Sequence, residues 1–159
     1  MVEHLIFTYN LNLEHIEKSL ENVSDDQMAQ QAHGVVNHPA WTLLHLASAS
    51  NMTATTLGLD STFPSEWEDV AKNGPGQASS AFPTKTQLLA ELSSQHSRVA
   101  EAVTKTDVSL FAKEFPNENY RKTFPTIGDF CAYLLTAHEG SHIGQIAAWK
   151  RAMKIESHD

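Results

Sequence analysis

The chain has 159 residues, of which 11 are basic and 19 acidic, so its formal charge is −8. This charge argues against nucleic acid and anionic membranes as partners, because both bind clustered Lys and Arg. Its length suits a single domain over residues 1–159, and its one cysteine, Cys131, excludes an intrachain disulfide and a multi-cysteine zinc site. No apolar run approaches the roughly 18 residues of a membrane span and no secretory signal pattern opens the chain, so we expect a cytoplasmic protein.

The first predicted helix runs from Val2 to about Asn22, because apolar residues recur there at spacings of three and four. Ser24 and Gln27 then form a capping-box pattern, which predicts a short helical turn. A second helix is predicted from Pro39 to Leu57, since proline is tolerated in a first helical turn. It is apolar on most sides, which predicts deep burial.

Residues 58–84 form a long predicted connection rich in Gly, Pro, Ser and Asp, with a helical turn expected around Trp67. A capping-box pattern opens a third helix over 84–105, and an irregular link follows over 106–125. Another capping-box pattern opens the last helix, over 126–153. No segment has a convincing strand pattern. Four long helices joined by polar links predict an all-α four-helix bundle.

The strongest local signal is the run His138-Glu139-Gly140-Ser141-His142 in the last predicted helix. Histidines four residues apart lie one helical turn apart, so that both can reach one metal ion. At 100° per residue they share a stripe with Cys131, Leu134, Gln145 and Trp149, and we expect that stripe to face the core. Buried imidazoles need partners, and a metal ion is an efficient one. The alternative is two core histidines that hydrogen-bond to neighbours or water.

The same five residues match the His-Glu-x-x-His pattern of zinc proteases, with Glu139 as general base. The pattern's known extension fails, because Gln145 and Ala148 stand where a glycine and a histidine are required. No edge strand is predicted to hold a peptide substrate. We therefore look for a third ligand on another helix.

His45 lies midway along the second predicted helix, on the same side as Trp41, Ala49 and Met52, so we expect it to be interior. Alone, such a histidine is more often a satisfied core residue than a ligand. Together with the pair on the last helix it completes a three-histidine set, and three histidines with an open position are a pattern of catalytic zinc.

Two stretches of the sequence resemble one known family. They are Asn37-His38-Pro39-Ala40-Trp41-Thr42-Leu43-Leu44-His45-Leu46-Ala47 and His138-Glu139-Gly140-Ser141-His142-Ile143-Gly144-Gln145-Ile146. The pattern is similar to that of the DinB-like superfamily, whose members carry a tryptophan and a histidine on the second helix and two histidines one turn apart on the last. The resemblance implies a four-helix bundle of up-down-down-up topology, with a long crossover between helices 2 and 3.

The resemblance also implies a divalent metal ion held by His45, His138 and His142. Imidazole ligands do not select one metal by themselves, and our expectation is zinc or nickel ahead of iron or manganese. Characterised relatives include thiol S-transferases and isomerases that use low-molecular-weight thiols, and relatives often dimerise. The resemblance therefore implies a small-molecule substrate, such as a low-molecular-weight thiol, and a homodimer. Many relatives carry a third histidine or a basic residue where this chain has Ser141 and Ile143, which leaves the substrate class open.

Three functions are open at this point. The first is a metal-dependent thiol S-transferase of detoxification or stress response, in which the metal lowers the pKa of a bound thiol. The second is a metal-dependent hydrolase with Glu139 as general base. The third is a non-catalytic metal-binding bundle that serves in interactions.

Several other residues are weaker candidates. Gln145 either orients a histidine or a metal-bound water or only packs. His96 is either a fourth ligand or proton shuttle or, as we prefer, a satisfied core or rim histidine. Gly144 costs about 1 kcal/mol in a helix relative to alanine, for which we expect close helix approach as the reason. We expect Cys131 in the core and the following histidines on the surface: His4, His15, His33 and His158.

Overall fold

The computed structural model describes residues 2–75 and 82–155, and these form an all-α structure without a strand. Two isolated β-bridges are the nearest approach to strand pairing within this part of the chain. No helix of the described residues is both long and apolar enough to cross a membrane. The long helices are α1 (Val2–Ser19), α3 (Pro39–Thr56), α5 (Lys85–Lys105) and a composite of α8 (Ile127–Tyr133), η3 (Leu134–His138) and α9 (Glu139–Ala152).

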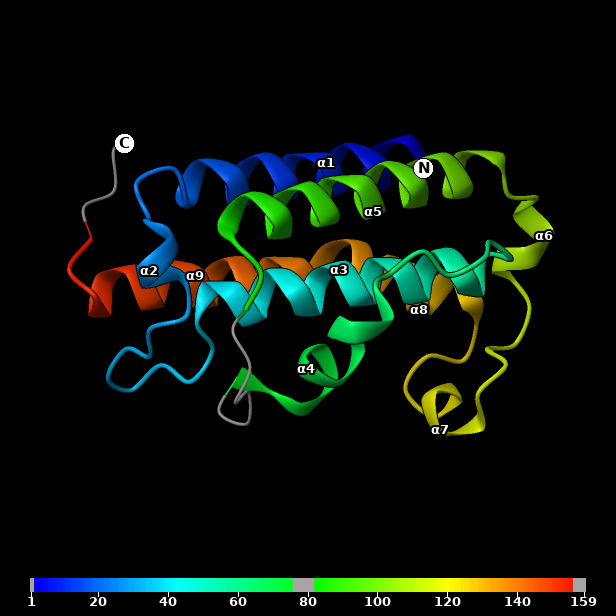
Figure 1. Cartoon of the computed structure of the whole chain (residues 1–159). Coiled ribbons are helices and arrows are strands. Elements are labelled where there is room, and N and C mark those ends of the chain that lie inside the picture. The colour runs from blue at the N-terminus through cyan, green and yellow to red at the C-terminus, as the bar shows by residue number, and fades with distance from the viewer. Residues whose placement is uncertain (1, 76–81, 156–159) are drawn as a thin grey trace.

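These four long rods lie side by side (Figure 1). Helices α3 and α5 run in one direction, and α1 and the α8–α9 rod run in the other. Because α3 and α5 are parallel, the chain between them has to return along the length of the bundle. The described part of this crossover carries η1 (Ser65–Trp67) and α4 (Glu68–Asn73), which confirms the helical turn predicted around Trp67.

The remaining helices are single turns at the ends of the bundle. Helix α2 (Asp25–Met28) opens with the predicted capping box of Ser24 and Gln27. The link predicted to be irregular contains α6 (Val108–Phe111) and α7 (Glu118–Arg121). Each has four residues, too few for an apolar period to show in the sequence, and each begins where an Asp or Asn side chain accepts from a backbone N–H.

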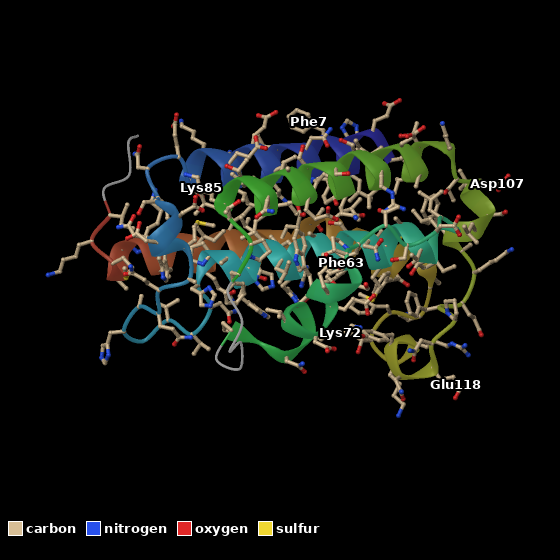
Figure 2. The ribbon with its side chains drawn as sticks, viewed as in Figure 1. Phe7, Phe63, Lys72, Lys85, Asp107 and Glu118 are labelled. Atoms are coloured by element: carbon tan, nitrogen blue, oxygen red, sulfur yellow. The ribbon has the colours of Figure 1, made fainter. Side chains whose placement is uncertain are left out.

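Helix α1 ends at Ser19, three residues before the predicted end. The ammonium group of Lys85, at the start of α5, donates to the carbonyl oxygens of Leu20 at 2.9 Å and Val23 at 2.7 Å. These contacts satisfy carbonyls that the helix no longer uses. They also attach the first turn of α5 to the end of α1 (Figure 2).

The last rod departs from the predicted continuous α-helix over Leu134–His138, which forms a π-helical turn. A π turn holds an extra residue, so it changes the angular positions of the residues that follow it. As a result, two adjacent residues at the turn point into the protein: His138 is half-buried and Glu139 is 2% exposed. Periodicity counted at 100° per residue has no means of detecting this change.

Two apolar clusters fill the bundle, one toward each end. The first includes Ile16, Leu20, Leu43, Leu92 and Trp149. The second includes Tyr9, Val99, Val103, Phe130 and Leu135. Polar residues lie between the two clusters along each long rod, and they are Asn12, Ser50, His96 and Glu139. We call this set the polar layer.

The glycines of the last rod differ in what surrounds them. A Cβ at Gly128 would lie 2.9 Å from the backbone oxygen of Phe111, so this glycine allows α6 to approach α8. A Cβ at Gly144 would meet nothing within 4 Å among the described residues. The expectation that Gly144 serves close helix approach is therefore wrong, and Gly128 is the position that does.

These contacts predict opposite effects of the same substitution. Gly128→Ala should lower the free energy of unfolding, because the methyl group collides with backbone that cannot rotate away. Gly144→Ala should raise it by about 0.5–1 kcal/mol, because alanine is the better helix former and the site is open. Urea unfolding followed by circular dichroism measures both. Equal destabilisation by the two substitutions would contradict the assignment.

Candidate metal centre

Three histidines from two rods converge in the interior. His45 comes from the middle of α3, His138 from the end of the π turn and His142 from the first turn of α9. One ring nitrogen from each lies within 4.8 Å of the other two, and the cluster can hold a metal ion. The sequence-predicted set is therefore together in space.

The environment of His45 orients its ring. Its Nδ1 atom lies 3.3 Å from the carbonyl oxygen of Ala71, which only accepts, so Nδ1 carries the proton and Nε2 keeps its lone pair. The ring also stacks on Trp41, with centroids 4.7 Å apart and planes 15° from parallel. Hydrogen bonding of the second nitrogen is the usual way that proteins orient a ligating histidine.

The distance between the ring nitrogens of His45 and His138 fits a shared metal ion. The Nε2 atoms of His45 and His138 are 3.1 Å apart. Two histidine nitrogens bound to one tetrahedral zinc ion lie about 3.3 Å apart, given Zn–N bonds of 2.0–2.1 Å. The observed separation is close to this value, so these two rings need little movement to share an ion, and the ligand atom of His142 lies within 4.8 Å of both.

The histidines also have the protonation state that a metal requires. Burial, and secondarily the neighbouring ligand histidines, lower the pKa of both His138 and His142 to about 4. Burial likewise lowers the pKa of His45, and its bond to the carbonyl of Ala71 opposes the change. All three imidazoles are therefore neutral at neutral pH and offer lone pairs. Buried Nδ1 atoms of His138 and His142 lack a well-aligned hydrogen-bond partner among the described residues, so these rings are incompletely satisfied as they stand.

Gln145 lies beside the cluster and connects it to the start of α3. Its Oε1 atom accepts from the side-chain amide of Asn37 at 2.8 Å. Gln145 also raises the pKa of His142, against the effect of burial. The described residues include no well-aligned hydrogen bond between Gln145 and His142, so both sequence interpretations of Gln145, orienting a ligand and packing, stay predictions.

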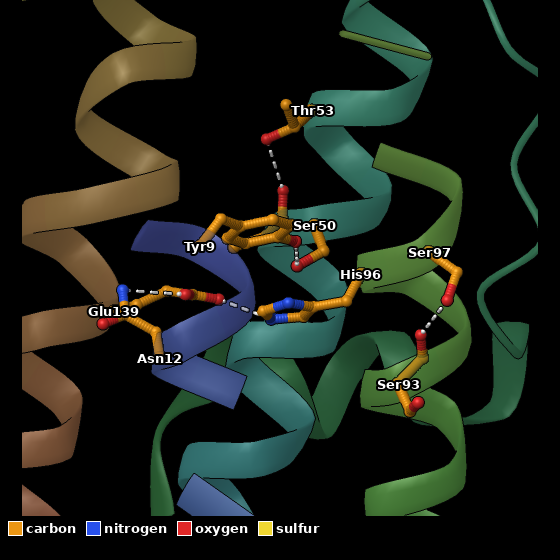
Figure 3. Close-up of polar contacts among 9 residues, drawn as sticks. Tyr9, Asn12, Ser50, Thr53, Ser93, His96, Ser97 and Glu139 are labelled. Atoms are coloured by element: carbon orange, nitrogen blue, oxygen red, sulfur yellow. Dashed lines mark hydrogen bonds and ion pairs between the residues drawn. The ribbon is translucent and has the colours of Figure 1, made fainter. Parts of the chain in front are cut away.

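Glu139 and His96 form a separate buried pair within the polar layer (Figure 3). Oε1 of Glu139 lies 2.7 Å from Nε2 of His96, an ion-pair distance at which the ring N–H is poorly aligned for a hydrogen bond. Oε2 of Glu139 accepts from the amide of Asn12 at 3.2 Å. The His96 ring stacks on Tyr9 at 3.7 Å, and the hydroxyl of Tyr9 lies 2.8 Å from that of Ser50.

This arrangement bears on two weaker sequence candidates. His96 contacts Glu139 and Tyr9 and is not in the three-histidine cluster, which favours the buried structural interpretation over a fourth ligand. Burial raises the pKa of Glu139, and the contacts with His96 and Asn12 oppose this increase. Because both carboxylate oxygens are engaged in the core, Glu139 is not positioned to accept a proton from a molecule beside His45.

The other sequence candidates are readily placed. Cys131 is buried as predicted, and burial raises the pKa of its thiol to about 12, so it is not a nucleophile at neutral pH. His4, His15 and His33 are exposed, as predicted. His158 lies outside the described residues.

A pocket of about 520 Å³ opens beside the cluster, with His45 and His138 in its lining. Helix α3 contributes one side, α4 a second, and the segment from α7 to η3 a third. Four aromatic residues line that third side, and we call them the aromatic wall: Tyr120, Phe124, Phe130 and Tyr133. The sequence analysis missed this wall, although the aromatic residues recur at intervals of three to six over 120–133.

Comparisons with known proteins bear on the family and the fold of the chain. The family model of the DinB superfamily matches residues 8–146, which is most of the chain. A crystal structure of a structural-genomics protein from Streptococcus pneumoniae aligns with a TM-score of 0.69 and 14% sequence identity, over 95% of this chain and 91% of that one. At this identity the likeness supports the fold alone. No curated protein matches the sequence.

The buried pair of His96 and Glu139 predicts how substitutions change the free energy of unfolding. His96→Ala should lower the free energy of unfolding by about 3–5 kcal/mol, because it leaves the Glu139 carboxylate buried without its closest partner. The double variant His96→Leu with Glu139→Met should recover most of this loss, since it removes both polar groups together. Urea unfolding with a chelator present is the measurement, with Ser97→Ala, exposed on α5, as the matched control. A double variant no more stable than His96→Ala would contradict this account.

The lowered histidine pKa values predict how the metal-free protein responds to acid. Because the folded pKa of His142 is about 4 and its ordinary value is 6.5, the unfolded chain binds more protons between these limits. Metal-free protein should therefore lose stability as the pH falls from 6.5 to 4, and His142→Gln should lose less. The contribution of Glu139 has the opposite sign and cancels in this difference. Melting temperatures at half-unit pH steps test it, with His15→Gln as the exposed control.

Proposed function

We propose that this chain, which belongs to the DinB superfamily, binds one divalent metal ion through His45, His138 and His142 and catalyses transfer of a low-molecular-weight thiol. The observation that carries the proposal is the convergence of three neutral imidazoles beside a pocket large enough for a small molecule. Zinc and nickel are the proposed ions, with iron and manganese as alternatives, since imidazole suits several of them.

The proposed chemistry divides between the ion and the protein. When bound by three neutral histidines with a position left open, such an ion lowers the pKa of a coordinated thiol or water toward neutrality. His45 keeps its lone pair toward the site because Ala71 accepts from the opposite nitrogen. Trp41 restricts the ring of His45 by stacking on it, and the pocket beside this ring receives the substrate.

Thiol transfer is preferred over hydrolysis because of what lines the pocket. Hydrolysis needs a general base near the reacting water, and the described lining residues include no carboxylate. Glu139, the sequence candidate for that base, is paired with His96 and Asn12 in the core. The proposed reaction therefore uses a nucleophile that arrives with the substrate, as a thiol does.

The alternative is a metal-binding bundle without catalysis, which shares the histidine site and differs only in turnover. A homodimer also belongs to the proposal. Phe7, which is 67% exposed, points away from the bundle on the outer side of α1 and offers an apolar contact for a second copy (Figure 2).

Metal content is the first test. Untagged wild-type protein should hold close to one equivalent of divalent metal, and His45→Ala should lose it, because two neighbouring histidines on one helix bind more weakly than three on two helices. Elemental analysis of the two proteins side by side is the measurement. His33→Ala, which changes an exposed histidine, should retain the metal.

Activity distinguishes the two functions. Loaded wild-type protein should transfer a thiol to an electrophile such as monobromobimane with saturable kinetics, and His45→Ala should be inactive. Full metal retention in His45→Ala would place the site on the last rod alone and count against the proposal. Metal binding without turnover on a panel of thiols would favour the non-catalytic bundle.

A further inference from the structure

The pocket beside the three histidines has an unusual lining for a protein of charge −8. Its walls consist largely of aromatic and aliphatic side chains, with Met52, Ala71 and Leu134 completing the four residues of the aromatic wall. Among the described lining residues, Lys72 is the only side chain that is charged at neutral pH. Its ammonium group lies 2.8 Å from the carboxylate of Glu68, and both side chains are exposed to solvent, which screens the charge of the lysine.

Two members of the aromatic wall are exposed although they are large and apolar. Tyr120 is 43% exposed and Tyr133 is 41% exposed, and both face this pocket. Phe130, by contrast, is 1% exposed and supports Tyr120 from behind, with ring centroids 6.2 Å apart. Exposed aromatic rings fixed on a rigid support typically mark binding sites.

Tyr133 belongs to the aromatic wall and also lies beside a candidate metal ligand, His138. Its ring centroid lies 5.0 Å from that of Phe124 and 5.8 Å from that of His138. A molecule that reaches the open position beside His138 would therefore pass over the face or edge of Tyr133.

We infer that the aromatic wall is a receptor for an uncharged aromatic or branched aliphatic group of the substrate, and that Tyr133 determines this specificity. The inference rests on the proposed function and names the substrate class for that site. An aromatic side chain contact contributes enough to discriminate such a group by about three- to tenfold. Charged groups gain little there, because Lys72 is solvated and already contacts Glu68, and the aromatic wall offers no charged partner.

The test uses cobalt-loaded protein, in which visible absorption reports a thiol that reaches the ion. Benzyl mercaptan should bind more tightly than 2-mercaptoethanesulfonate. Tyr133→Ala should weaken benzyl mercaptan about tenfold and leave 2-mercaptoethanesulfonate and cobalt affinity unchanged. Tyr133→Phe should retain the preference, because the ring and not the hydroxyl makes the contact. Val108→Ala is the matched control, an exposed apolar residue outside the pocket.

A metal-free arm separates the inference from the proposed function. The uncharged fluorophore N-phenyl-1-naphthylamine should bind the chelator-treated protein, and Tyr133→Ala should weaken that binding as well. If cobalt does not bind but the fluorophore result holds, the proposed function fails and the apolar receptor stands. Equal affinity for the two thiols, or no effect of Tyr133→Ala in either arm, overturns the inference. A dimer that Tyr133→Ala dissociates, seen by sedimentation, with unchanged ligand affinities would make the wall an interface instead.

Discussion

Ionisable side chains buried in the middle of an apolar helical bundle impose the constraint on which the rest of this structure depends. Each such group loses its hydration and must either pair with a group of the protein or give up its charge. Glu139 finds His96 and Asn12, whereas the three clustered histidines give up their protons and remain neutral. The same burial that would otherwise destabilise the fold leaves imidazole lone pairs that can receive a cation.

The π turn before α9 directs the clustered histidine His138 and the buried carboxylate Glu139 to different sites. It lies directly before Glu139, and the residue at its end, His138, faces the pocket while Glu139 faces the polar layer. One segment of chain thus contributes to two different sites, one in contact with the pocket and one closed to it. Such turns are frequent at functional sites because an extra residue re-aims side chains without breaking the helix. The separation also explains why a sequence match to a zinc-protease pattern does not produce that geometry here.

The candidate site was more predictable than its surroundings. His138 and His142 share a helix, so their spacing alone places them together, and the resemblance of the segment around His45 supplies the third ligand. The aromatic wall was missed because two members, Tyr120 and Phe124, come from an irregular link, and only the packing of that link against α8 brings them to Phe130 and Tyr133. Gly144 was misinterpreted for a related reason: a glycine in a helix has a known cost, but what lies next to it depends on another element.

The sequence by itself determined the helical class, the long helices to within a few residues, and the capping boxes at Ser24, Thr84 and Thr126, all of which rest on interactions between residues close in the chain. Only the tertiary structure decided that Glu139 pairs with His96 across the bundle, that Ala71 orients His45, and that a pocket opens beside the histidines. These features join residues from different rods. Their geometry depends on how the rods pack and on one π turn, and no local period in the sequence records either.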